Sequence, residues 1–118
     1  IDGVLCKDSA VTALQKHTAE AADGAITISA GTVIFTKAGV NAMTLAAPSA
    51  GQAGTRMTFV AGSANAHTIT ATGLIDDGVT GGSKNVATFA AFVGASIVLE
   101  AYNSKWVVVG AGNNVTVS

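Results

Sequence analysis

Residues 97–109 read IVLEAYNSKWVVV, and this stretch decides the fold class. It holds two runs rich in β-branched and aromatic residues, one on each side of Asn103 and Ser104. Such runs are typical of β-strands, and a two-residue spacer between them predicts a tight hairpin. Tyr102 and Trp106 then lie on paired strands, and their polar groups need hydrogen-bond partners wherever they are buried.

Outward from this hairpin, alternation of apolar and polar residues continues along most of the chain. A period of two is the mark of strands with one buried face. We expect strands at residues 25–29, 32–37, 42–45, 56–61, 67–72, 86–89, 97–102, 105–109 and 115–117, with a loop at 46–55, a long polar loop at 73–85 and a turn at 110–114. Short strands separated by small-residue turns predict an all-β fold, a small sandwich or barrel of short antiparallel strands.

The first 24 residues differ from the rest. We expect an N-terminal arm or short helix at residues 1–24 and a β-rich domain at 25–118. A helix from about Ser9 to Ala22 is favoured by the alanine content and by Asp8 and Ser9 as capping residues. Its apolar side is thin, however, and an isolated helix of this length is marginal in water. An extended arm that docks on a neighbouring molecule is the equal alternative.

The charge content restricts the function classes. Only 11% of the 118 residues are charged, against about 25% in an average soluble domain. Six Lys and Arg against seven Asp and Glu give no basic surplus for a phosphate backbone, so we expect no nucleic-acid partner. No stretch is apolar for long enough to form a membrane-spanning helix, and no membrane partner is expected. A chain so poor in charge is most easily kept in solution by burying apolar surface against other copies, which predicts an oligomer; the alternative is a neutral, threonine-rich monomer.

The candidate chemical residues are few. Cys6, His17 and His67 have no metal-ligand spacing, and Cys6 as the only cysteine excludes a disulfide within the chain. We interpret each histidine as either exposed or satisfied within the core, and the cysteine as a free thiol without an activating frame. We therefore assign no catalytic, cofactor-binding or metal-ligating residue and expect no cofactor.

Several short motifs are weak for the same reason. Residues 76–78, Asp-Asp-Gly, lack the alternating acids of a calcium loop and are interpreted as a solvated turn. Residues 110–112 and 78–84 contain glycines without the strand–loop–helix frame of a phosphate site. The sequon at 114–116 is interpreted as the start of a strand, and Glu100 is expected to point outward beside the inward Leu99.

A family resemblance covers roughly residues 25–118. It rests on residues 45–51 (LAAPSAG), 57–59 (MTF), 66–70 (AHTIT), 87–89 (ATF), 97–109 and 114–117 (NVTV). In this order they resemble small β-rich virion proteins of tailed bacteriophages, in particular capsid decoration (cement) proteins. Phage fibre and spike modules share the closing hairpin with its Tyr-Asn-x-Lys-Trp pattern.

The resemblance implies a non-enzymatic structural subunit located on the capsid surface of the virion. Its implied partners are the major capsid protein and copies of itself, as a homotrimer in preference to a dimer. Residues 1–23 are then expected to act as an arm that reaches across neighbouring subunits. A tail fibre or spike module that binds a host surface receptor is the alternative, whereas a hydrolase has no supporting set of residues.

Overall fold

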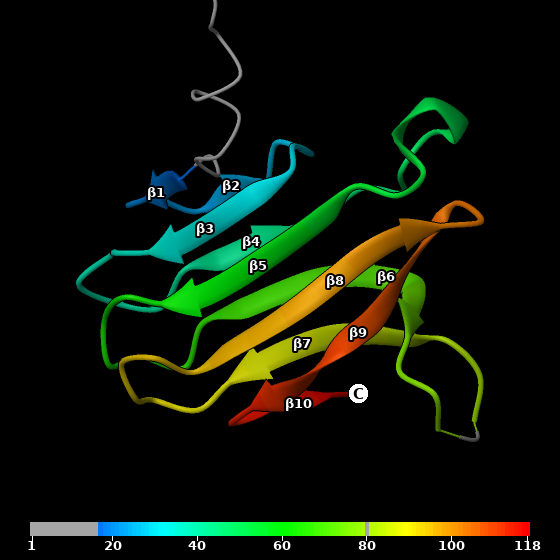
Figure 1. Cartoon of the computed structure of the whole chain (residues 1–118). Coiled ribbons are helices and arrows are strands. Elements are labelled where there is room, and N and C mark those ends of the chain that lie inside the picture. Colours follow the sequence, from blue (N-terminus) through cyan, green and yellow to red (C-terminus); the bar gives the residue numbers. More distant parts are fainter. Residues whose placement is uncertain (1–16, 80) are drawn as a thin grey trace, which may run out of the picture.

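The computed structural model describes residues 17–79 and 81–118, which form ten strands and one short 3-10 helix (Figure 1). The elements are β1 (His17–Glu20), β2 (Gly24–Ala25), β3 (Gly31–Phe35), β4 (Ala42–Thr44), η1 (Ala50–Gln52), β5 (Arg56–Ala61), β6 (Thr68–Asp76), β7 (Lys84–Phe89), β8 (Ser96–Tyr102), β9 (Lys105–Asn113) and β10 (Val115–Val117). The predicted all-β class is confirmed.

All ten strands belong to one sheet that curls into a half-barrel of two layers. The first layer has the order β1-β3-β5-β8-β9, and the second has the order β2-β4-β6-β7-β10. The layers join where β6 pairs with β9, at Ile75↔Trp106 and Asp76↔Val107. On the opposite side only residues 21–23 separate β1 from β2, a link that spans at most about 14 Å. The edge strands β1 and β2 therefore lie close together.

The strand pairing is mixed, so the expectation of an antiparallel sheet was wrong for half of the molecule. The pairs β1–β3, β3–β5, β2–β4, β4–β6 and β6–β9 are parallel, whereas β5–β8, β8–β9, β6–β7 and β7–β10 are antiparallel. The physical reason is that the chain alternates between the layers from β1 to β6. Each parallel neighbour is reached through a strand of the other layer, which supplies the crossover that parallel pairing needs.

The core fills the space between the layers. Buried residues alternate along β3, β5 and β8 in the first layer and along β4, β6 and β7 in the second. Phe35 of β3 stacks on Phe59 of β5 at 6.2 Å between ring centroids and meets the edge of Phe89 of β7 at 5.5 Å. Trp106 is fully buried and its Nε1–H donates to the carbonyl of Ala46 at 2.9 Å, which confirms that its polar group finds a partner.

The hairpin predicted from residues 97–109 is confirmed. Tyr102 and Lys105 are paired across the turn, and Asn103 and Ser104 both have positive φ, at 54° and 59°. Two consecutive left-handed residues match the right-handed twist of the flanking strands, which is why two-residue hairpins use this conformation. Tyr102 itself points to solvent.

The helix alternative for the N-terminal segment was wrong where it can be checked. Residues 9–16 lie outside the described part of the chain, but His17–Glu20 form β1 and pair in parallel with β3. Backbone pairing to β3 supplies partners that a solitary alanine-rich helix lacks, so tertiary contact overrides helix propensity here. β1 belongs to the same sheet as the β-rich region, although it lies within the segment predicted as an arm or helix.

Two loop boundaries also differ from expectation. β6 continues to Asp76 and β7 begins at Lys84, so the polar loop covers residues 77–83 and not 73–85. The pairing register of β6 and β7 shifts between Thr70 and Ile75, and this irregularity lets β6 pass a polar segment and still bury Ile75. β9 likewise runs to Asn113 through the glycines expected in a turn, and the chain reverses at Asn114, whose φ is 58°.

Candidate interaction surfaces

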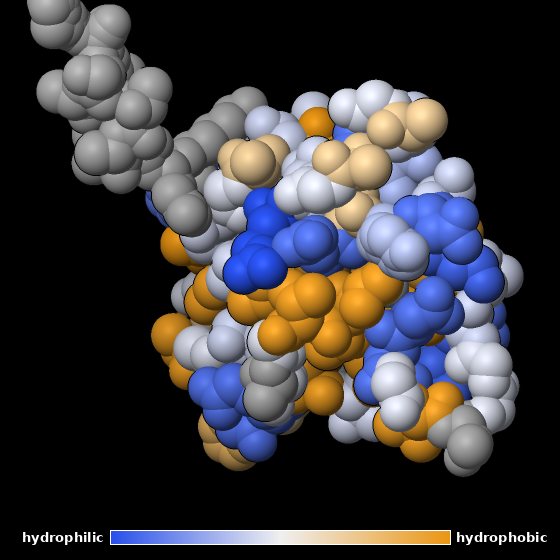
Figure 2. Space-filling view, turned by 45° about the vertical axis from the view of Figure 1, so that its right-hand side comes forward, coloured by the Kyte–Doolittle hydropathy of each residue, from blue (hydrophilic) through white to orange (hydrophobic). Residues whose placement is uncertain are grey.

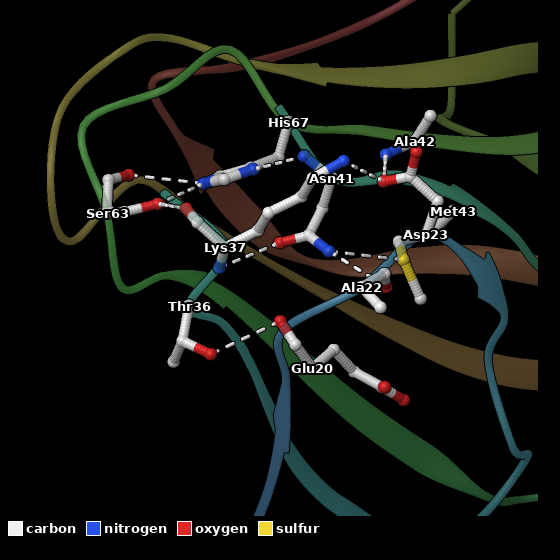
Figure 3. A network of polar contacts seen from close by, with 10 residues as sticks. All are labelled: Glu20, Ala22, Asp23, Thr36, Lys37, Asn41, Ala42, Met43, Ser63 and His67. Atoms are coloured by element: carbon white, nitrogen blue, oxygen red, sulfur yellow. Dashed lines mark hydrogen bonds and ion pairs between the residues drawn. The ribbon is translucent and has the colours of Figure 1, made fainter. Parts of the chain in front are cut away.

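His67 is fully buried and occupies the centre of a polar network (Figure 3). Its Nδ1 accepts from the backbone N–H of Asn41 at 2.9 Å, and its Nε2 lies 3.1 Å from Oγ and 3.2 Å from the carbonyl oxygen of Ser63. A backbone N–H can only donate, so Nδ1 carries no proton and Nε2–H is the donor to Ser63. The ring packs at an angle against Phe35 and Phe89. His67 is thus a satisfied core histidine, one of the two predicted environments.

The same network ties neighbouring loops together. The side-chain amide of Asn41 donates to the carbonyl of Ala22 at 3.0 Å, and its Oδ1 accepts from the N–H of Lys37 at 3.3 Å. Ser63 Oγ donates to the carbonyl of Lys37 at 2.6 Å. Because the hydroxyl proton of Ser63 is committed to a backbone carbonyl, this serine is not an activated nucleophile beside His67. The network joins the loops 36–41 and 62–67 to the link between β1 and β2.

The remaining sequence candidates within the described residues do not converge on a reactive centre. His17 is exposed on β1, and Cys6 lies outside the described residues. Asp76 Oδ1 accepts from Ser83 Oγ at 2.6 Å, while Asp77 caps its own loop through the N–H of Val79 at 3.1 Å. Within residues 17–79 and 81–118, no three His, Cys, Asp or Glu side chains are grouped as metal ligands.

A cavity of about 210 Å³ lies beside β1, the segment 26–30 and β3. Hydroxyl-bearing and apolar side chains line it, and Glu20 is the one ionisable side chain among them. Among the lining residues, which all belong to the described part of the chain, Glu20 has no second acid, base or cation with which to form an acid–base pair.

The outer face of the first layer carries an apolar band. Register places Ile34 beside Val60, Val98 beside Thr58, and Val107 beside Glu100 on the side opposite the core. We call this surface the valine face and define it by Ile34, Val60, Val98, Val107 and Val109. Val109 is the extra residue of a bulge opposite Val98 and is 43% exposed. Figure 2 shows a hydrophobic patch of this kind, bordered by strongly hydrophilic side chains.

One ion pair lies in the valine face. Arg56 and Glu100 are direct cross-strand partners on β5 and β8. The guanidinium donates twice to the same carboxylate oxygen, from Nε at 3.0 Å and from Nη2 at 2.7 Å. This confirms that Glu100 points outward. A positive and a negative charge therefore lie side by side at the border of the apolar band.

The outer face of the second layer carries mainly threonine side chains where the first layer carries valine. The row Ala42, Thr68, Thr88 and Thr116 crosses β4, β6, β7 and β10, and the next row places Thr44 beside Thr70 and Val86. We call this surface the threonine face and define it by Thr44, Thr68, Thr70, Thr88 and Thr116. Its hydroxyl groups can be hydrated, whereas the methyl groups of the valine face cannot.

The end of the sheet with the loops 36–41, 62–67 and 90–95 carries a second apolar feature, and we call it the loop end. Phe92 is 66% and Val93 is 68% exposed there. Their loop is fixed by backbone bonds: Gly94 N–H donates to the carbonyl of Ala61 at 2.9 Å, and Ala61 N–H donates to that of Ala95 at 2.8 Å. The three loops contain one Lys or Arg and no acid, and that residue, Lys37, is paired with Asp23 at 2.9 Å.

Comparison with protein-family models, with curated proteins and with solved structures gives no match for this chain. In the described part of the chain there is also no helix with the length and hydrophobicity to cross a membrane.

Proposed function

We propose that this chain is a structural virion protein that binds the outer surface of a phage capsid as an oligomer and stabilises the shell. The observation that carries the proposal is the loop end, where two large apolar side chains are held out on a rigid loop that is otherwise uncharged. A preorganised apolar knob loses little entropy on binding, and exposed aromatic side chains are typical energetic centres of interfaces. The family resemblance supplies the class of partner, a capsid shell.

Mechanically, such a protein acts by holding neighbouring shell subunits together. Many copies on one shell add weak contacts into lasting attachment, so each loop end needs only modest affinity. The side chains that could carry out chemistry in the described residues instead hold the fold together, as His67 and Ser63 do. This supports a non-enzymatic role.

The test is addition of the purified protein to bare heads of the tailed phage that encodes it, followed by imaging of the heads. We expect a regular lattice of bound protein. Replacing both Phe92 and Val93 by Ser should reduce head occupancy at least about tenfold, because the apolar contact is lost. Val79→Ser is the matched control, since Val79 is 64% exposed on the loop 77–83 at the opposite end of the sheet. Equal occupancy by all three proteins would contradict the proposal.

The arm proposed at residues 1–23 needs a separate deletion. That segment includes β1 and part of the link to β2, so removal of residues 1–16 tests the arm without removing a described strand. Lower head occupancy of the shortened protein at unchanged folding stability supports the arm. Unchanged occupancy removes it from the proposal.

A fibre or spike module that binds a host receptor is the second candidate, favoured by one observation. Tyr102 is 68% exposed beside the β8–β9 turn, at the end of the sheet opposite Phe92. Exposed tyrosine next to a tight turn is a common contact residue in recognition surfaces. Binding of the protein to host cells, lost in Tyr102→Ser and retained in the Phe92 and Val93 double variant, would favour this candidate over decoration.

A further inference from the structure

We propose that the valine face is the contact between two copies of this chain, related by a twofold axis that runs parallel to β5 and β8 and between them. The inference rests on the proposed oligomeric function, because it names the partner of one surface of that oligomer. It commits to a second copy because the charges on this face are self-complementary.

The self-complementary charges are those of one cross-strand pair. Arg56 and Glu100 lie side by side, one on each side of the line between β5 and β8. Rotation by 180° about an axis along that line places Arg56 of one copy opposite Glu100 of the other, and Glu100 opposite Arg56. Both contacts are attractive, and both are made by the same operation. Any twofold arrangement that superposes like charges is disfavoured, so the pair selects this axis.

The apolar residues follow the same register. With the axis in that place, Val98 of one copy lies opposite Thr58 of the other, and Val60 lies opposite Ser96. Each valine therefore faces a hydroxyl-bearing residue and not another valine, and only the pair of Val60 and Ser96 sets a larger side chain opposite a smaller one. With no pair of bulky side chains set against each other, the two sheet faces can approach to the spacing of about 10 Å seen between packed sheets.

The size of the face sets the strength of the contact. The valine face spans the four strands β3, β5, β8 and β9, which at about 4.8 Å spacing and about 20 Å length have a footprint of roughly 380 Å² per copy. A stable complex buries roughly 800 Å² per partner. The contact is therefore expected to be weak, with a dimer that forms at micromolar or higher concentration and dissociates on dilution.

The axis has a consequence for attachment. Rotation about a line parallel to the strands leaves the strand direction unchanged, so both loop ends lie on the same side of the dimer. Phe92 and Val93 of the two copies then face one common surface. The dimer is bivalent toward a shell, which is the geometry that gains most from multivalent binding.

Sedimentation of the purified full chain tests the dimer first. Between about 1 µM and about 1 mM, we expect the mass to rise from one chain to two. Arg56→Glu and Glu100→Arg each place like charges opposite one another twice, so each variant alone should associate at least about tenfold more weakly. A mass that stays at one chain over the whole range for the unaltered protein overturns the inference.

Mixing the two variants gives the decisive result. Arg56→Glu carries two acidic side chains at this site and Glu100→Arg carries two basic ones, so a twofold contact pairs them favourably only across the mixed dimer. We expect an equimolar mixture to recover the association that each variant lost. Recovery is not explained by folding, because each variant keeps its own defect. Failure to recover, or association unaffected in the single variants, overturns the axis.

Thr70→Glu and Thr88→Arg are the matched controls on the threonine face, and both should leave the mass unchanged. The outcome is also separable from that of the proposed function. If the protein is strictly monomeric but binds bare heads, the dimer is wrong and the decoration function stands. If the mixed variants recover association but the protein binds no head, the decoration function is wrong and the dimer stands.

Discussion

The two outer faces of this sheet differ in little but polarity. Both cover the same core, both lie on strands of one continuous sheet, and both are built mainly from β-branched residues. Valine and threonine have almost the same shape and both favour strands. The choice between them therefore does not affect the fold and reports what lies outside each face. In the proposed dimer, the hydroxyl groups of the threonine face remain in water and the methyl groups of the valine face contact a second copy.

The two outer faces keep their positions only while the two layers stay packed together. The largest loss of stability is therefore expected at the buried network that joins the layers. His67→Ala removes the acceptor of the Asn41 N–H and opens a cavity beside Phe35 and Phe89. A buried donor without a partner and a large-to-small change together should lower the free energy of unfolding by about 3 kcal/mol. Urea denaturation followed by the fluorescence of Trp106 measures it.

His17→Ala is the control for that variant, because His17 is exposed on the edge strand β1. We expect a change within about 0.5 kcal/mol. Similar losses in the two variants would show that the buried network does not hold the layers together.

Much of this architecture could be predicted from local pattern. Strict alternation predicts strands at 56–61 and 97–102. The first coincides with β5, and the second lies within β8. The hairpin followed from a two-residue spacer. The parallel pairing could not be predicted, because alternation within a strand does not say which strand lies beside it. The late start of the loop 77–83 was missed because Thr72 and Gly73 resemble the end of a strand, whereas a register shift carries β6 past them.

The valine face could not be predicted from the sequence, for a related reason. Val107, Val108 and Val109 do not alternate, so nothing in the run distinguishes inside from outside. Pairing with β8 shows that Val108 faces the core with Leu99 and that Val107 faces outward with Glu100. Contrast between the faces appears only when the rows of different strands are aligned. The knob formed by Phe92 and Val93 was missed because an apolar pair next to a strand was not expected to lie exposed in a loop.

An exchange of side chains between the faces should alter association and spare the fold. Val60→Thr with Val98→Thr makes the first layer resemble the second, at nearly unchanged shape. Loss of buried methyl groups in both copies should weaken the dimer about thirtyfold, or about 2 kcal/mol. Sedimentation measures the effect. The reverse exchange, Thr68→Val with Thr88→Val, should lower solubility without strengthening that dimer, and an equal response of the dimer to both exchanges would mean that the faces are equivalent.

A smaller effect is expected at Gly62, which allows Ile34 to lie flat on the valine face. A Cβ at Gly62 would lie 2.6 Å from Ile34 Cγ2 and 3.0 Å from the carbonyl oxygen of Phe35. The isoleucine can turn away but the backbone oxygen cannot, so Gly62→Ala should lower the free energy of unfolding by about 1 kcal/mol.

Gly39→Ala is the matched control, with no atom within 4 Å of the added carbon. It should be neutral or slightly stabilising, because alanine restricts the unfolded chain. Equal results for the two variants in thermal unfolding would show that the close approach is tolerated.

The smallest effect is expected for the pH dependence of stability, which depends on Asp23 in the link between the edge strands β1 and β2. The backbone N–H of Ala42 donates to the Asp23 carboxylate at 3.0 Å, and this bond, followed by that from Lys37, holds the pKa of Asp23 below its ordinary value of 3.8. The unfolded chain then binds the proton more readily, so the stabilisation is present above about pH 4 and is lost as the pH falls through the lowered pKa.

Asp23→Asn keeps a side-chain acceptor for the Ala42 N–H and removes the charge. Urea denaturation between about pH 2 and pH 6 should therefore show the unaltered protein more stable at the upper end and the difference disappearing at the lower end. A difference that is constant with pH would mean that the carboxylate charge of Asp23 does not contribute to stability.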